Sequence, residues 1–527
     1  MHGAPAIEAT GESAWIPKLR GGFTRTQAGG LSPWERVLDR TDGSEMTERT
    51  IVWFRGKDLR VSDHAPLRDA LAVGEVIPLF VLDPHFFAPD RARELPHRMQ
   101  FLLDSLRALA AALEARGSRL LVVAGKSVEI VPLLARKWKA DRVVAQRWVE
   151  PMGRERDRRI REALGAKFEL FEGETLMPPG LLRTGAGAPY SVFSQFARVF
   201  RQTAMISRPL PAPRALPPLP RDIRVREAVI PTCEQLGIDR NPAVLAGGER
   251  AAKLRLRRFL RNAAAAYSEQ RDRMDLAGTS RLSADLKFGT LSVCQVWSAV
   301  KTALGETPAA RCFLNELVWR EFSHSTLWDR PELLEQPFRP GFVGFPWRYA
   351  EGLWQAWVTG NTGYPIVDAA SRQLLGEGFV HNRARMITAS FLTKHLLIDY
   401  RRGEAHYMKY LTDGDWAQNN AGWQWSAGCG CDAQPYFRIF NPIIQGKRFD
   451  PAGDYVRRWV PELAQLPARH IHHPWEAPDS VLRCAGVRLD ETYPRPIVDH
   501  RFARERFLAT AAKHLKRRSS LQAQGAG

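Results

Sequence analysis

The chain has 527 residues, which is enough for two or more domains with their own hydrophobic cores. Its 76 basic and 57 acidic residues give a net charge of +19, which favours a polyanionic partner, above all nucleic acid, over a small neutral substrate. The six cysteines are scattered, and the pair Cys429 and Cys431 has no second pair at zinc-ligand spacing, so we expect neither a disulfide framework nor a metal site. No run of about 18 apolar residues and no secretory signal is present, so we expect no membrane span and a cytoplasmic protein.

The first 48 residues differ in composition from the rest of the chain. They are rich in Gly, Thr and Ser and show no hydrophobic periodicity, which predicts a disordered leader over 1–48. Met46 stands just before the first strand pattern. We therefore expect the working protein to start near Met46, and removal of residues 2–45 to leave folding and activity unchanged.

From Thr50 the pattern alternates between short apolar runs and amphipathic segments, which predicts a Rossmann-like α/β domain over 49–177 with a parallel five-stranded sheet. The strand candidates are 50–54, 76–82, 119–123, 142–146 and 168–171. No GxGxxG follows the first strand and no P-loop occurs, so an ordinary dinucleotide or nucleoside triphosphate site is not supported.

A long connection follows at 178–247, with six prolines between Pro209 and Pro220 that exclude helix interior and central strand. Before these prolines, 190–200 reads as a short helix. From Glu249 the pattern is almost wholly helical, which predicts an all-α domain over 248–500. A short basic tail, 501–527, ends the chain.

Polar residues gather within the helical part. In the helix-like piece 379–397, Asn382 and Met386 share one face, and His381 and Arg385 share the next. The run DGDWAQNNAGWQW then brings carboxylates, amides and indoles together, as suits a planar ligand with polar edges. The alternative is a set of helix caps and buried tryptophans.

Two further segments carry the same mixture of groups. In FLNELVWREF, Glu316, Trp319 and Arg320 stand at i, i+3 and i+4 and so share a helical face, although Glu316 and Arg320 could form an ordinary helix ion pair. In GTSRLSADLKFGTLS, hydroxyl side chains near a helix start suit a phosphate, or a simple N-cap.

Seven segments resemble the signatures of the photolyase/cryptochrome family, most closely the bacterial class I cyclobutane pyrimidine dimer photolyases. They cover about residues 50 to 500 in the family's order and read WFRGKDLRVSDHAPL, GTSRLSADLKFGTLS, NELVWREF, TGYPIVDAASRQL, HNRARMITASFLTKHLLID, DGDWAQNNAGWQW and PYFRIFNPIIQGKRFD. The resemblance implies an α/β antenna domain, a linker, and a helical domain that holds FAD in a U-shape. It implies light-driven repair, in which excited reduced FAD passes an electron to a flipped-out dimer, the cyclobutane ring splits, and the electron returns.

The resemblance also implies roles for individual residues. The expected FAD contacts are Tyr267, Thr279, Ser280, Arg281, Leu282, Ser283, Phe313, Arg320, Arg385, Asp413, Gly414, Asp415 and Asn419. The expected dimer and DNA contacts are Arg271, Glu316, Trp319, Asn382, Arg383, Met386, Trp425, Arg438 and Gln445. Arg385 should pair with Asp413 beside the isoalloxazine ring, Asn419 should face flavin N5, and Glu316 should hydrogen-bond the dimer and stabilise its radical anion.

The subtype depends on single positions. The 6-4 photolyases carry histidines where this chain has Asn382 and Met386, which argues against that chemistry. Plant cryptochromes typically carry Asp at the position of Asn419. A cryptochrome-type blue-light receptor with little repair activity is the alternative, and weak dimer repair with light-dependent partner binding would favour it.

The electron relay departs from the class I pattern of three tryptophans. Trp423 and Trp347 match the inner and outer positions, but the middle residue is Tyr400. A phenol with a pKa of about 10 must lose its proton when oxidised, which slows transfer. We expect photoreduction to be impaired, or to take another aromatic such as Trp354, and a Tyr400→Trp variant to speed it.

The antenna site departs from the family as well. Folate-binding members carry Asn-Glu after the fourth strand, whereas Met152 and Gly153 follow Glu150 here, which argues against that folate. A deazaflavin, another flavin or no antenna remain open. We expect a monomer that binds damaged DNA, single- or double-stranded.

Overall fold

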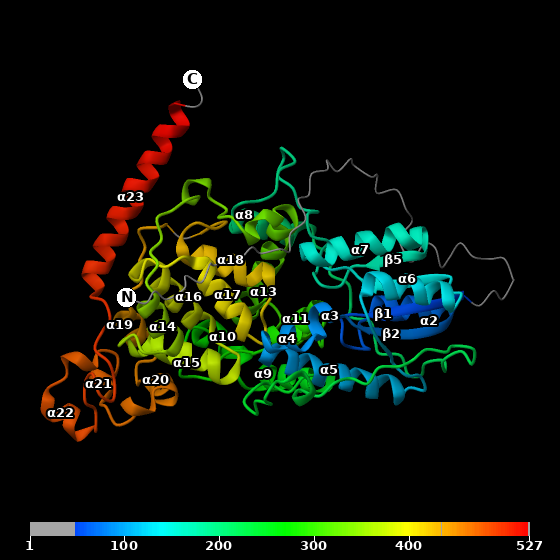
Figure 1. Cartoon of the computed structure of the whole chain (residues 1–527), viewed down its shortest axis with the longest axis horizontal. Coiled ribbons are helices and arrows are strands. Elements are labelled where there is room, and N and C mark those ends of the chain that lie inside the picture. Colours follow the sequence, from blue (N-terminus) through cyan, green and yellow to red (C-terminus); the bar gives the residue numbers. More distant parts are fainter. Residues whose placement is uncertain (1–47, 434, 525–527) are drawn as a thin grey trace, which may run out of the picture. The chain divides into compact units, whose positions relative to one another are not determined.

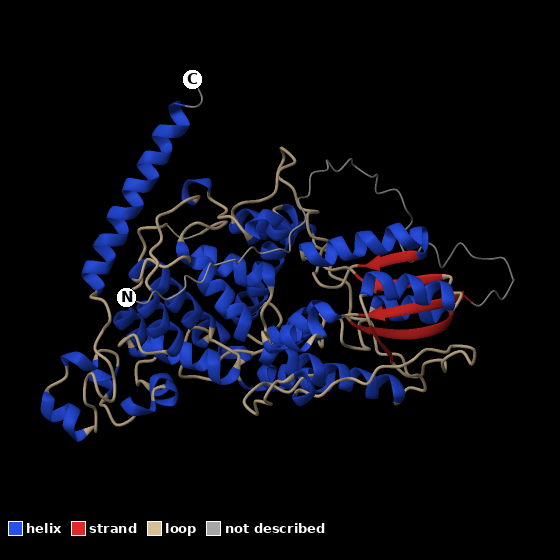
Figure 2. Cartoon of the chain, viewed as in Figure 1, coloured by secondary structure: helices blue, strands red, loops and turns tan. Residues whose placement is uncertain are grey.

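The computed structural model describes residues 48–433 and 435–524 (Figure 1). The predicted leader and the proposed start near Met46 lie outside the described residues. Figure 2 shows that the strands lie together in one part of the chain and that the other part is built of helices. Among the described residues, no helix is both long and apolar enough to cross a membrane.

The predicted five-stranded parallel sheet is confirmed, with strand order β3-β2-β1-β4-β5. The strands are β1 (Glu48–Phe54), β2 (Gly74–Leu82), β3 (Leu121–Ala124), β4 (Arg142–Gln146) and β5 (Phe168–Phe171). β4 and β5 have the predicted bounds, whereas β1 and β2 begin two residues earlier and β3 lies slightly later. Ile51 of β1 pairs with Ile77 of β2 and Val143 of β4, so the continuous apolar runs lie in the sheet interior.

Helices cover both faces of the sheet because successive residues of a strand point to opposite sides. Val52 and Phe54 belong to one core with α2 (Ala65–Val73) and α5 (Pro96–Glu114). Ile51 and Trp53 belong to a second core with α6 (Ser127–Lys137) and α7 (Pro151–Leu164). The short helices α3 (Pro84–Phe87) and α4 (Pro89–Arg93) follow β2.

The long connection is packed rather than loose. The helix predicted at 190–200 is α8 (Phe193–Thr203), and the ring of Phe193 stacks on Trp319 with centroids 3.5 Å apart. Further along, Leu216 and Leu236 are buried against the sheet core. The connection thus joins the α/β part to the helical part through hydrophobic contacts.

The rest of the described chain is mostly helical, as predicted from Glu249, and a helix also covers most of the predicted basic tail, 501–527. The helices are α9 (Glu249–Asn262), α10 (Tyr267–Gln270), α11 (Ser283–Phe288), α12 (Val293–Leu304), α13 (Pro308–Asp329), α14 (Glu351–Thr359), α15 (Pro365–Glu377), α16 (Asn382–Ser390), α17 (Tyr400–Tyr410), α18 (Trp416–Ala427), α19 (Pro442–Phe449), α20 (Asp454–Trp459), α21 (Ala468–Ile471), α22 (Asp479–Cys484) and α23 (His500–Gln524).

The helix-like piece predicted over 379–397 is divided in the structure. α16 begins only at Asn382, because His381 is its N-cap and accepts a hydrogen bond from the amide of Arg383. After Ser390 the backbone widens into a π-helical turn, Phe391–His395, and Leu397 has a positive φ of 60°. The prediction of one helix was therefore wrong at both ends, while its middle faces the site described below.

Candidate functional site

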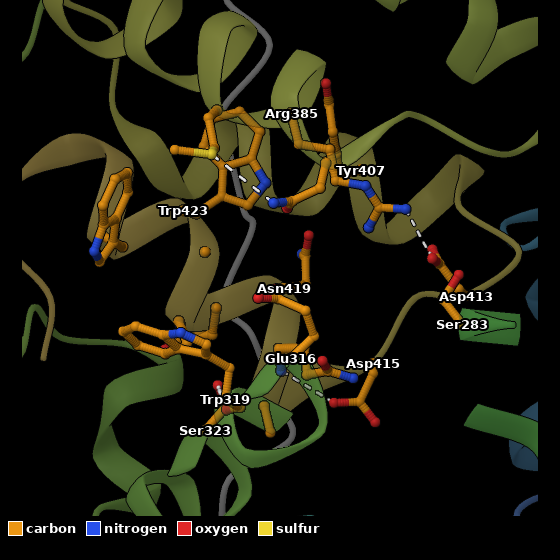
Figure 3. A pocket seen from close by; sticks show the side chains of 18 of the residues that line it. Ser283, Glu316, Trp319, Ser323, Arg385, Tyr407, Asp413, Asp415, Asn419 and Trp423 are labelled. Atoms are coloured by element: carbon orange, nitrogen blue, oxygen red, sulfur yellow. Dashed lines mark hydrogen bonds and ion pairs between the residues drawn. The ribbon is translucent and has the colours of Figure 1, made fainter. Parts of the chain in front are cut away.

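A cavity of about 540 Å³ lies within the helical part (Figure 3). Its walls come mainly from α10, α11, α13, α16, α17 and α18 and from the turns that precede α11, α16 and α18. The sequence-predicted residues that line it are Tyr267, Arg271, Thr279, Ser280, Arg281, Leu282, Ser283, Glu316, Trp319, Asn382, Arg383, Arg385, Met386, Asp413, Asp415, Asn419, Trp423 and Trp425. Residues distant in sequence are thus brought to one site.

Seven predicted residues lie outside this lining. Phe313 is buried between Phe259 and Tyr267, with ring centroids 5.0 and 5.1 Å away, so it packs behind the wall. Gly414 lies against the Arg98 guanidinium, since a Cβ there would be 3.0 Å from it. The others are Arg320, Tyr400, Trp347, Arg438 and Gln445. Their proposed roles stay predictions.

The shared face expected for Glu316 and Arg320 does not produce an ion pair. Glu316 pairs instead with Arg271 of the segment after α10, at 2.7 Å. Arg320 is buried, and its Nη1 donates to the Glu174 carbonyl oxygen at 2.6 Å. Sequence spacing placed both residues on α13 correctly, but the neighbouring elements decided their partners.

One side of the cavity presents a cation and an acceptor. The predicted pair of Arg385 and Asp413 is present, with 2.7 Å between Nη2 and Oδ2. Arg385 Nε also donates to the Val380 carbonyl oxygen at 2.8 Å. Among the described residues, no group donates a hydrogen bond to the other oxygen of Asp413, Oδ1. This oxygen is therefore ready to accept a hydrogen bond from a ligand N–H.

Asn419 lies between α17 and the cavity. Its Nδ2 donates to the Glu404 carbonyl oxygen at 3.1 Å, which leaves Oδ1 as the acceptor toward a ligand. The Glu404 carboxyl accepts from Asn420 Nδ2 at 3.1 Å, and burial raises the pKa of Glu404 to about 8. A neutral acid and two amides therefore hold this wall at neutral pH.

The opposite side carries Glu316 and an aromatic surface, while Arg385 and Asp413 lie across the cavity (Figure 3). Burial raises the pKa of Glu316 above its ordinary value, and Arg271 opposes that shift. Phe193 stacks on Trp319 with an interplanar angle of 6°, so the indole has a firm backing.

Several lining residues were not predicted as site residues. His381 is buried, and burial lowers its pKa to about 4 despite the Asp272 carboxylate, so the imidazole is neutral. Phe379, Ser323 and Tyr407 also line the cavity. The signal for His381 was its place beside Asn382 at the start of a polar helix. Tyr407 gave no such signal, because its contact depends on how α17 packs.

The aromatic contacts of Trp423 lead away from the predicted relay. Its ring centroid lies 6.1 Å from that of Trp357, and the Trp357 ring stacks on Trp354 with centroids 5.4 Å apart. The ring centroids of Trp347 and Tyr400 are 6.5 Å apart. The Tyr400 hydroxyl is buried without a hydrogen-bond partner among the described residues, and burial raises its pKa.

A cluster of metal-ligand type lies behind the cavity, which the sequence did not reveal. The ligand atoms of Glu174, His324 and Asp415 lie within 4.8 Å of one another. The Lys57 ammonium is ion-paired with Glu174 and lies 3.5 Å from Asp415. The carboxylates thus already have a cation from the protein itself.

The two residues that depart from the folate pattern, Met152 and Gly153, lie in the first turn of α7. A Cβ on Gly153 would lie 2.7 Å from the Cβ of Trp148, so this position takes glycine because the indole packs on it. The identity of an antenna chromophore stays open.

Two protein-family descriptions match the chain. Residues 50–215 match "DNA photolyase", and residues 313–513 match "FAD binding domain of DNA photolyase". A protein named deoxyribodipyrimidine photo-lyase from Agrobacterium fabrum is 42% identical over 477 residues, which is 88% of this chain and 98% of the relative.

Solved structures show the same relationship. A bacterial class III photolyase from Agrobacterium tumefaciens superposes with a TM-score of 0.83 at 40% identity, over 90% of this chain and 100% of that one. A cryptochrome from Synechocystis sp. PCC6803 superposes with a TM-score of 0.80 at 31% identity, over 87% of this chain and 99% of that one. The sequence motifs thus resemble class I photolyases, whereas one of the similar solved structures is named a class III photolyase.

Proposed function

The chain belongs to the photolyase/cryptochrome family, and we propose that it repairs DNA by splitting cyclobutane pyrimidine dimers in light. The observation that carries the proposal is that one cavity combines two kinds of wall. Asp413, Arg385 and Asn419 suit a flavin ring. Glu316 and Trp319 suit the two linked bases of a flipped-out dimer. The proposal is the same whether the chain belongs to class I or to class III of the photolyases.

The cavity residues fit FAD. The free Asp413 Oδ1 and the Asn419 Oδ1 would accept hydrogen bonds from ring N–H groups, and the paired Arg385 would offset negative charge on a reduced ring. Thr279 and Ser280, just before α11, would donate to the diphosphate. When bound, reduced FAD supplies the light-excited electron that the dimer receives and later returns.

The other wall would hold the dimer. Trp319 and Trp425 offer stacking surface. Glu316, which pairs with Arg271, would form a hydrogen bond with the edge of a pyrimidine. Asn382 Nδ2 lies 3.9 Å from the Met386 sulfur, so this wall offers an amide and a thioether and no histidine pair. That chemistry suits cyclobutane dimers rather than 6-4 lesions.

We propose that electrons reach the cavity through Trp357 and Trp354 rather than through Tyr400. The indoles of Trp423, Trp357 and Trp354 are in continuous ring contact. The Tyr400 phenol would have to lose its proton on oxidation, and no described group accepts it. We expect a Trp357→Phe variant to photoreduce more slowly than wild type. A Tyr400→Phe variant should photoreduce at the wild-type rate. The reverse order would reject this route.

The experiment that tests the function is repair of a thymine-dimer oligonucleotide by chemically reduced protein, under blue light and in darkness. Light-dependent loss of the dimer supports the proposal, and a Glu316→Gln variant should then repair more slowly while it retains FAD. No repair by protein with bound, photoactive FAD would favour a blue-light receptor, which the cryptochrome relative supports as second candidate.

A further inference from the structure

A buried group of charges lies at the carboxyl edge of the sheet, where the sheet meets the helical part. Lys57 follows β1, Glu150 follows β4 and Glu174 follows β5, so three adjacent strands each contribute one charge. Lys57 Nζ lies 2.8 Å from Glu150 and 3.5 Å from Asp415, and it also donates to Glu174. Asp415 stands just before α18 in the helical part.

The loop that carries Lys57 is itself clamped to the helical part. The amide of Leu59 donates to the Phe288 carbonyl oxygen at the end of α11, at 3.2 Å. Gly289 lies so close to the Lys57 backbone that a Cβ there would meet the Lys57 carbonyl oxygen at 1.9 Å. Lys57 therefore projects from a fixed base, and its ammonium has a defined position.

The charges in this group depend on one another because all are buried. Burial lowers the pKa of Lys57, but Glu150, Glu174 and Asp415 raise it well above its ordinary value. Burial opposes ionisation of Asp415, yet His324 and Lys57 hold the pKa of that carboxyl well below its usual range. Removal of one partner from such a group leaves an uncompensated buried charge.

Asp415 links this group to the cavity through its two oxygens. Oδ1 accepts the amide of Gln418 at 3.0 Å and so caps the start of α18. Oδ2 lies 3.5 Å from Lys57 Nζ and 3.6 Å from His324 Nε2. One and two turns further along, α18 carries Asn419 and Trp423, which line the cavity. The position of these two side chains therefore depends on how Asp415 is held.

We propose that Lys57 is a positioning residue of the FAD site: through Asp415 it fixes the start of α18 and with it the contacts that Asn419 and Trp423 make. Lys57 is not among the residues that line the cavity, so it acts through α18 and does not touch the ligand. The α/β part is thus required for a well-formed flavin site, whatever its role in light harvesting. The inference rests on the proposed function in one respect, that the ligand is FAD.

The first experiment compares purified holoprotein of wild type and a Lys57→Met variant. The rate of FAD release, followed by the rise in flavin fluorescence, should increase about tenfold or more, as when one partner of a buried charge pair is removed. The visible absorption band of the retained FAD should also shift, because the Asn419 contact changes. Lys253→Met is the matched control, since Lys253 pairs with Glu249 but is 39% exposed, and it should release FAD like wild type. Wild-type release and spectrum in Lys57→Met would overturn the inference.

A charge-balanced pair of variants separates positioning from simple neutralisation. Glu150→Gln alone leaves Lys57 with Glu174 and Asp415, so FAD release should stay near wild type. Lys57→Met/Glu150→Gln removes one cation and one of its anions, which favours folding even if Lys57→Met alone does not fold. Fast FAD release in this double variant supports the inference. Wild-type release there would show that Lys57 only balances buried charge.

Dimer repair, measured per bound FAD in the same proteins, keeps the two proposals apart. If wild type releases FAD slowly, and both Lys57→Met and the double variant release it quickly, the positioning role stands even where no protein repairs dimers. If wild type repairs dimers and all variants release FAD equally, the proposed function stands and the positioning role fails.

Discussion

The cavity in the helical part and the carboxyl edge of the sheet gather similar side chains but use them differently. In the cavity, Asp413 Oδ1 has no described partner and the space stays open. At the sheet edge, the Arg55 and Arg156 guanidinium groups lie over Trp148, and Lys57 lies among carboxylates. Parallel sheets commonly bind ligands at this edge. Here cations of the protein itself pair with the carboxylates at that edge, whereas the cavity lies among the helices.

The largest expected difference between the two regions concerns photoreduction. A Trp423→Phe variant should lose photoreduction, because the indole lines the cavity and begins the contacts to Trp357. A Trp148→Phe variant makes the same chemical change at the sheet edge and should photoreduce like wild type. Transient absorption after a light pulse measures both. Equal rates in the two variants would remove the distinction between the regions.

For stability, the buried charges of the sheet edge should matter more than an exposed ion pair. Asp157 lies 2.6 Å from Arg55 and 3.3 Å from Arg156, and all three are buried or nearly so. An Asp157→Asn variant removes the carboxylate that the two buried cations share, so the free energy of unfolding should fall by about 3–5 kcal/mol. Asp104→Asn breaks the more exposed pair with Arg240 and should cost less than about 1 kcal/mol. Denaturant titration of each protein gives these values, and a stable Asp157→Asn variant would contradict the charge account.

A smaller effect is expected for substrate binding at the cavity. A Trp319→Ala variant should weaken binding of dimer-containing DNA by about 1–3 kcal/mol, the range for one lost base stack. Binding of undamaged DNA should change little, because phosphate contacts dominate it. Trp319→Phe, which retains a ring against Phe193, should recover much of the affinity. Titration with both DNAs at one salt concentration checks this, and equal losses for both would place Trp319 outside the lesion site.

The pH dependence of stability should also separate the regions. At the sheet edge, burial opposes ionisation of Glu174, but Lys57 and His324 lower the pKa of its carboxyl to about 2. Near the cavity, burial raises the pKa of Glu404 to about 8. Unfolded Glu loses its proton near pH 4.3, so between about pH 4.3 and 8 the folded state binds more protons at Glu404. Stability from this group is complete below that range and falls as pH rises, by at most about 1.4 kcal/mol per pH unit.

Glu404→Gln tests this, because the amide cannot ionise. The difference in unfolding free energy between wild type and the variant should change across pH 5–8 and level off above about pH 8. A constant difference over that range would mean that Glu404 is ionised in the folded protein.

Sequence periodicity determined the sheet and which residues share a face of α13 and of α16, whereas most other residues of the cavity wall were predicted from the family resemblance. Continuous apolar runs such as the one that contains Ile51 can be satisfied only between helices, so five parallel strands followed. The spacing of Asn382 and Met386, and of Glu316 and Trp319, placed each pair on one helical face. These properties are local, since the pitch of a helix fixes which residues share a face.

The tertiary structure alone decided which partner each side chain meets. Arg271 rather than Arg320 took Glu316, because the segment after α10 packs beside that face of α13. Trp357 of α14 came into contact with Trp423, and Lys57 of the sheet edge reached Asp415. Such contacts join residues from about 45 to more than 350 positions apart and depend on how whole elements pack, which no local spacing encodes.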